Sequence, residues 1–111
     1  MADTRAVLLA FIEDGSLEIL EGIEDARRRY AGRDVQSGVV RFYDERGNYL
    51  GPRLRGPAFD LEPDPGAGED PIRLALYETA VLRPNRWFAT IEALKAALRA
   101  QGADVDGPLP A

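Results

Sequence analysis

A continuous apolar run from Ala6 to Ile12 opens the pattern of hydrophobic and polar residues, and polar Glu13-Asp14-Gly15 follows it. An uninterrupted apolar run of this length predicts a strand that is buried on both faces. Such a strand lies in the middle of a sheet rather than at its edge. We therefore expect residues 6–12 to form a central strand.

The segment after this strand allows two interpretations. Apolar residues at helical spacing, with acidic residues first and arginines last, predict a helix that begins at Ser16 as N-cap and ends near Gly32. Alternatively, Asp14-Gly15 forms a hairpin turn, residues 17–19 return as a strand, and the helix begins only near Gly22. The helix from Ser16 is our leading expectation.

Residues 39–44 and 48–50 are rich in aromatic and aliphatic side chains and flank a short polar segment that ends in Gly47. Because glycine readily adopts the left-handed conformation of short loops, this pattern predicts a β-hairpin. The chain then becomes rich in proline, and its acidic part, residues 62–71, predicts a surface loop.

Apolar and polar residues alternate again from Ile72 onward, which predicts a long strand over residues 72–82 and makes it a candidate partner of the first strand. Pro84-Asn85 end this strand. Thr90 is a suitable N-cap for a second helix, which places its apolar side chains on one face and ends near Gly102. Residues 104–111 are expected to form a frayed tail.

These elements predict an α+β fold, in which two helices pack on one face of a mostly antiparallel sheet of about four strands. The length of 111 residues fits a single globular domain over residues 1–111. The first apolar run is shorter than a membrane span and leads into acidic residues, so we expect a cytoplasmic protein with no membrane partner.

Composition narrows the chemistry further. The chain has no cysteine and no histidine, which excludes thiolate and imidazole catalysis and removes the most common transition-metal ligands. Its net charge of −5 disfavours nucleic-acid binding, which needs a basic surface, and suits a basic protein partner.

The acidic and glycine-rich segments do not complete a known binding motif. Asp60, Glu62 and Asp64 alternate like the start of a calcium loop, but prolines replace the required glycine and the final acidic ligand. A looser cation site that adds Glu69 and Asp70 is a minor alternative. Gly66-Ala67-Gly68 lacks the third glycine of a dinucleotide fingerprint. We therefore predict no metal and no cofactor.

Two charged features have ordinary structural explanations. Glu78 is the only acid within an apolar stretch, and we expect it to face solvent or to pair with an arginine of a neighbouring strand rather than to act in catalysis. Arg27, Arg28, Arg29 and Arg33 form a basic cluster that would suit phosphate or an acidic partner. Basic residues at a helix end are, however, common because they complement the helix dipole.

Aromatic residues and arginines concentrate in the predicted hairpin and after the predicted long strand. Because tryptophan, tyrosine and arginine dominate interface hot spots, we predict a partner-binding surface; core packing of the aromatic residues is the competing interpretation. The candidate residues are Arg41, Tyr43, Arg46, Tyr49, Arg83, Arg86 and Trp87.

The leading functional hypothesis is a non-enzymatic protein-binding domain, such as an inhibitor, an immunity protein or a regulatory protein. It depends on the absence of histidine, cysteine, a phosphate loop and a metal motif from an acidic chain with a well-specified fold. The alternative is a small enzyme or small-molecule binder that uses Asp, Glu, Tyr and Arg side chains in a pocket. A purely structural role is the third hypothesis.

Overall fold

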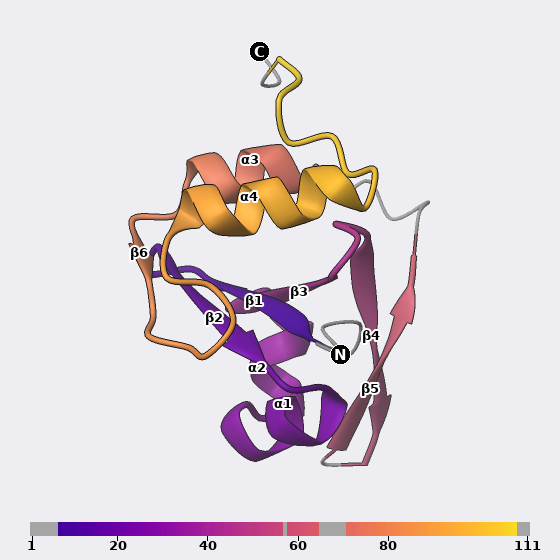
Figure 1. Ribbon diagram of the computed structural model, residues 1–111. Helices are drawn as coiled ribbons and strands as arrows, with labels where there is room; N and C mark the ends of the chain where they lie inside the picture. The colour runs from indigo at the N-terminus through magenta and orange to yellow at the C-terminus, as the bar shows by residue number, and fades with distance from the viewer. Residues whose placement is uncertain (1–6, 57, 65–70, 109–111) are drawn as a thin grey trace.

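A twisted sheet separates two helical layers in the computed structural model (Figure 1), which describes residues 7–56, 58–64 and 71–108. Within these residues the sheet has six strands in the order β5-β4-β3-β1-β2-β6. The pairings are antiparallel except for β2 with β6. The strands are β1 (Leu8–Ile12), β2 (Ser16–Leu20), β3 (Val40–Asp44), β4 (Tyr49–Arg55), β5 (Ala58–Pro63) and β6 (Val81–Leu82).

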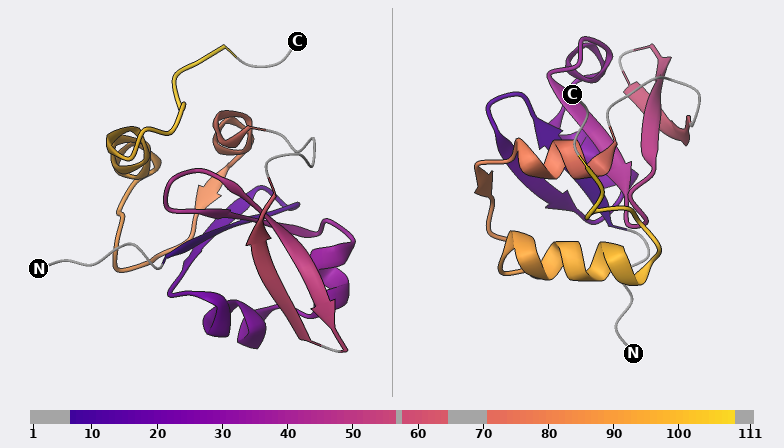
Figure 2. Two further views of the ribbon diagram at one scale, coloured as in Figure 1. Left: turned by 90° about the vertical axis from the view of Figure 1, so that its right-hand side faces the viewer. Right: turned by 90° about the horizontal axis from the view of Figure 1, so that it is seen from above.

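The helices cover both faces of the sheet. α3 (Ile72–Tyr77) and α4 (Ile91–Ala100) lie side by side on one face, whereas α1 (Ile23–Arg29) and α2 (Gly32–Gln36) lie on the other (Figures 1 and 2). The predicted α+β class and mostly antiparallel sheet are confirmed. The described part of the chain differs from the expectation in having six strands and four helices, with two helices on each face.

The segment after β1 forms a hairpin strand, so the helix expected from Ser16 is wrong and the alternative interpretation is confirmed. β2 pairs with β1, with Leu17 opposite Phe11 and Ile19 opposite Leu9. Gly15 adopts a φ of 92° in the turn. Alternation places Leu17 and Ile19 in the core on the α3/α4 side, which a helix over the same residues would not achieve.

The long strand expected over residues 72–82 is also wrong, because its first half is helix α3. Ile72, Ala75 and Leu76 are buried at the i, i+3 and i+4 positions of a helical face. Ile72 and Leu76 fit alternation and helical spacing equally well, which explains the misassignment. Only β6 is extended, and it pairs with β2 rather than with β1.

The proline-rich segment contributes a second hairpin. β4 continues through Pro52 and returns as β5, so residues 62 and 63 of the expected loop belong to a strand; residues 65–70 lie outside the described residues. β3 pairs with β4 only at Phe42 with Leu50 and Tyr43 with Tyr49. Pro52 lies beyond this pairing, where its missing N–H costs no bond to β3.

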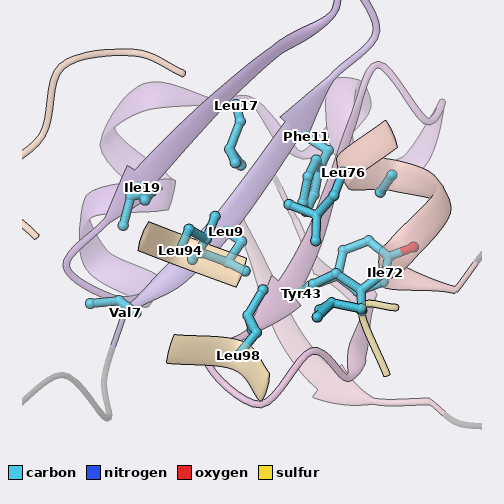
Figure 3. Close-up of a cluster of buried hydrophobic side chains, with 12 residues drawn as sticks. Val7, Leu9, Phe11, Leu17, Ile19, Tyr43, Ile72, Leu76, Leu94 and Leu98 are labelled. Atoms are coloured by element: carbon cyan, nitrogen blue, oxygen red, sulfur yellow. The ribbon is translucent and has the colours of Figure 1, made fainter. Parts of the chain in front are cut away.

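Two apolar clusters hold the layers together, one on each side of the sheet. The cluster under α1 and α2 contains Leu8, Ala10, Leu20, Ala26, Val35, Val40, Phe42, Leu50 and Phe59. The cluster under α3 and α4 (Figure 3) contains Val7, Leu9, Phe11, Leu17, Ile19, Tyr43, Ile72, Ala75, Leu76, Leu94, Leu98 and Val105. β1 contributes alternate side chains to both clusters, as its central position requires.

Helix α4 has the predicted ends, but the chain beyond it is more ordered than expected. The Thr90 hydroxyl accepts a hydrogen bond from the N–H of Ala93, and Gly102 has a φ of 90° after the last turn. Val105 is buried in the cluster under α3 and α4. Arg99 holds Asp106 through two hydrogen bonds of 2.7 and 2.8 Å. Residues 104–106 therefore do not form a frayed tail.

Candidate functional site

The two tyrosines among the predicted partner-binding residues lie at the core. Tyr43 is 1% exposed, and the edge of one ring meets the face of the other in its contacts with Phe11 at 5.3 Å and Tyr49 at 5.7 Å. Tyr49 is half-buried and packs against the same cluster. Tyr43 therefore presents no surface to a partner, and core packing accounts for its aromatic ring.

Arg41 lies on β3 beside an open hollow of about 320 Å³, which Glu13 and Glu78 also line. Its guanidinium is 4.0 Å from a carboxylate oxygen of Glu78, which follows α3 and is 57% exposed. Glu78 therefore pairs with an arginine of a strand, as expected. Glu78 itself follows helix α3 and does not belong to a strand.

Arg46 lies in the turn between β3 and β4, next to a different hollow. Asp44 orders this turn by accepting hydrogen bonds of 2.9 Å from the N–H groups of Arg46 and Asn48. Arg46 itself is exposed and lines a hollow of about 330 Å³ together with Arg73 and Asp104. The hollows beside Arg41 and Arg46 share no lining residue.

The three remaining candidates, Arg83, Arg86 and Trp87, lie on the loop that follows β6. The Arg83 N–H donates to the carbonyl of Leu17 at 2.9 Å and so fixes the start of the loop to β2. The Arg86 guanidinium lies 4.9 Å from the centre of the Trp87 ring, a cation–π contact, and also pairs with Glu21.

Asn85 gives this loop its shape. Its side-chain oxygen accepts hydrogen bonds from the N–H groups of Trp87 at 2.9 Å and Phe88 at 2.7 Å. An asparagine in this role replaces the backbone acceptors that a regular element would provide. The turn directs Trp87 and Phe88 against the cluster under α3 and α4, where both rings are half-buried.

The sequence analysis missed two apolar side chains next to this loop. Among the described residues, the large apolar side chains that are exposed are Leu54 at 44%, Tyr77 at 73% and Val81 at 57%. Tyr77 ends α3, and Val81 begins β6. Both residues lie in the segment that the sequence analysis assigned to one strand over residues 72–82. The side that Tyr77 faces is set by the helical period of α3 and not by the alternation of a strand. We define the β6 surface as Tyr77, Val81, Arg83, Arg86 and Trp87.

Carboxylates surround the arginines of the β6 surface. Arg83 is 3.8 Å from Asp14, whose carboxylate accepts hydrogen bonds from the hydroxyl and N–H of Ser16; these bonds hold the pKa of Asp14 below its usual value. The β6 surface is therefore a mixed-charge region with exposed apolar side chains.

Outside the β6 surface, burial, together with a hydrogen bond donated to Glu18, raises the pKa of Tyr30.

Asp60 and Glu62 of the acidic segment pair with arginines of α1 and β4, and of the basic cluster Arg27 takes part in this pairing. Asp60 pairs with Arg27 and Arg55, and Glu62 pairs with Arg53. Glu69 and Asp70 of the looser cation site lie outside the described residues. In the described ranges, acidic side chains do not gather in groups of three or more that would hold a metal ion.

Comparisons with known sequences and structures assign no family to this chain. None of the helices in the described part of the chain has the length and apolar character needed to cross a membrane. Comparison with protein-family models, with curated protein sequences and with solved structures found no match for this chain.

Proposed function

We propose that this protein is a non-enzymatic domain that binds another protein through the β6 surface. The observation that carries the proposal is the exposure of Tyr77 and Val81 in the same stretch of the chain as Arg83, Arg86 and Trp87. Exposed apolar side chains next to tryptophan and arginine have the composition of an interface centre.

The loop after β6 supports this role because its side chains are held before a partner arrives. Glu21 and the Trp87 ring both fix the Arg86 guanidinium, and Asn85 fixes the backbone of Trp87. A side chain that is already ordered loses less conformational entropy on binding. The β6 surface is thus suited to tight contact without large rearrangement.

Charge at the margin of the β6 surface supports a basic partner. Asp14, Glu21 and Glu78 have side chains that are 59%, 57% and 57% exposed. Together with the net charge of −5, these acids favour a partner whose apolar patch is bordered by lysines or arginines. The target of a small acidic inhibitor or immunity protein has this character.

A double variant, Tyr77→Ala with Val81→Asp, tests the proposal. Immobilised wild-type protein is expected to retain a stoichiometric basic protein from host lysate at low salt, and the double variant is expected to lose it. Ala96→Glu adds the same negative charge on an exposed position of α4 and serves as the matched control. Equal retention by the double variant, with thermal unfolding showing that it is folded, would exclude the β6 surface.

The hollow beside Arg41 supports a second candidate function, the binding of a small molecule. Its floor includes Phe11 and Ala75, while the Arg41 guanidinium and the Glu13 and Glu78 carboxylates line it. Opposite charges around an apolar floor suit a small zwitterion such as an amino acid. Titration with a mixture of amino acids, followed by amide NMR shifts at residues 11–16 and 75–79, tests this candidate; unchanged spectra at millimolar concentration count against it.

A further inference from the structure

An open apolar groove lies between α2 and the hairpin of β4 and β5, at the opposite end of the sheet order from β6. Its volume is about 330 Å³, and Leu54, one of the exposed large apolar side chains of the described chain, forms part of its wall. The groove is lined by Ala31, Gly32, Arg33, Gln36, Leu54 and Gly56.

Arg33 differs from the arginines around it. Arg27, Arg28 and Arg29 on α1, and Arg53 and Arg55 on β4, each pair with a carboxylate. Within the described ranges, no carboxylate lies within ion-pair distance of Arg33, which is exposed at the side of the groove. Its guanidinium therefore offers its donors to a ligand without first breaking an internal ion pair.

We propose that this groove docks an extended segment of a partner protein in which an aliphatic side chain lies next to a carboxylate. The aliphatic side chain covers Leu54 and the apolar wall, and the carboxylate pairs with Arg33. Gln36, which is exposed on the same helix, presents an amide to the backbone of the segment. A carboxylate alone would leave Leu54 uncovered, and an apolar segment alone would leave Arg33 unpaired.

This docking surface goes beyond the proposed function, because it uses different elements and selects the opposite charge. The β6 surface is bordered by acids and favours a basic partner, whereas the groove presents an unpaired cation beside an apolar wall. The two surfaces therefore allow the protein to contact two different segments at the same time.

NMR titration of the 15N-labelled protein tests the proposal with a blocked hexapeptide of alternating Glu and Leu. We expect saturable shifts of the amide resonances of residues 31–36 and 54–56. A peptide with Gln in place of Glu is expected to bind about tenfold more weakly. Arg33→Gln is expected to remove this difference between the two peptides, and Leu54→Ser to weaken both of them.

Arg46→Gln is the matched control, because it removes an exposed arginine from a different turn and is expected to leave the titration unchanged. Equal affinity for the two peptides, shifts confined to other residues, or the absence of shifts at millimolar peptide would overturn the proposal. A dimer of the wild type that Leu54→Ser dissociates would also overturn it, since the occupant would then be a second copy.

The double variant Tyr77→Ala with Val81→Asp separates this proposal from the proposed function. It is expected to bind the acidic peptide as the wild type does. In the wild type, peptide binding without capture of a protein from lysate would leave the groove as the docking surface and exclude the β6 surface, whereas capture without peptide binding would exclude the groove.

Discussion

Arg27 on α1 donates a hydrogen bond from Nε to the backbone carbonyl of Phe59 on β5, with an N–O distance of 2.9 Å. The same guanidinium pairs with Glu24 at 2.6 Å and with Asp60. Because β5 is the outermost strand of the sheet, this carbonyl lies at an edge where another strand would otherwise add. Arg27 therefore ties α1 to the sheet and blocks part of its edge.

Replacement of Arg27 by Met keeps the apolar stem and removes the donors. We expect the free energy of unfolding to fall by about 1–2 kcal/mol, because the Phe59 carbonyl and the Asp60 carboxylate lose a charged donor. The exposed edge of β5 is expected to promote self-association, which sedimentation velocity measures alongside urea unfolding. Arg53→Met, which removes an exposed pair with Glu62, is the control. A monomeric Arg27→Met protein with wild-type stability would contradict this role.

Asp25 makes stability depend on pH. Burial disfavours its charge, but hydrogen bonds from Arg29 and from the N–H of Glu21 outweigh burial and lower the pKa of Asp25 below 3.8. A lowered folded-state pKa gives stability that is present above the unfolded-state pKa and is lost as the pH falls through the folded-state value. The loss is expected from about pH 5 downward.

Asp25→Asn tests this dependence. We expect the free energy of unfolding at pH 7 to fall by about 1–3 kcal/mol, because the amide does not replace the charged hydrogen bonds. We also expect the free energy of unfolding to depend less steeply on pH below about pH 5. Urea unfolding at a series of pH values measures both effects. Glu92→Gln, in an exposed pair with Lys95, is the comparison and is expected to change little. An unchanged slope in Asp25→Asn would show that other groups carry the acid dependence.

Asn85 positions the only tryptophan of the chain, so its role is visible in fluorescence. Asn85→Ala removes the acceptor for two N–H groups and is expected to lower the free energy of unfolding by about 1–2 kcal/mol. The emission of Trp87 is expected to shift to longer wavelength as the ring becomes more exposed to water. Asn85→Asp keeps an acceptor at the same position and is expected to retain the wild-type emission. Identical spectra for all three proteins would rule out this role.

Alanine substitutions at Gly47 and Gly38 distinguish the energetic cost of backbone strain from that of steric crowding. Both have positive φ, 85° and 84°, but a Cβ on Gly47 would lie 3.0 Å from the Cβ of Ala103 and 3.2 Å from Cγ2 of Ile72, whereas Gly38 has open space. Gly38→Ala is expected to cost about 1 kcal/mol from backbone strain alone. Gly47→Ala is expected to cost about 1–3 kcal/mol more because of overpacking. Thermal unfolding measures both, and equal losses would refute the close packing.

Local signals were sufficient to predict the hairpin of β3 and β4 and helix α4. Gly47 marks the hairpin turn, while Thr90 and Gly102 mark the ends of α4, and each of these residues acts on its own neighbours in the chain. Arg86 and Trp87 lie in contact because residues so close in sequence remain close in the fold.

Tertiary structure decided the elements whose patterns fit two periods. Ile72 and Leu76 are consistent with a strand or a helix, and only the packing of Ala75 against the sheet selects the helix. Residues 16–20 became a strand because β1 was available to pair with them. The candidate surface depended on the same step: the fold buried Tyr43 and exposed Val81, since exposure depends on which residues distant in sequence pack against a side chain.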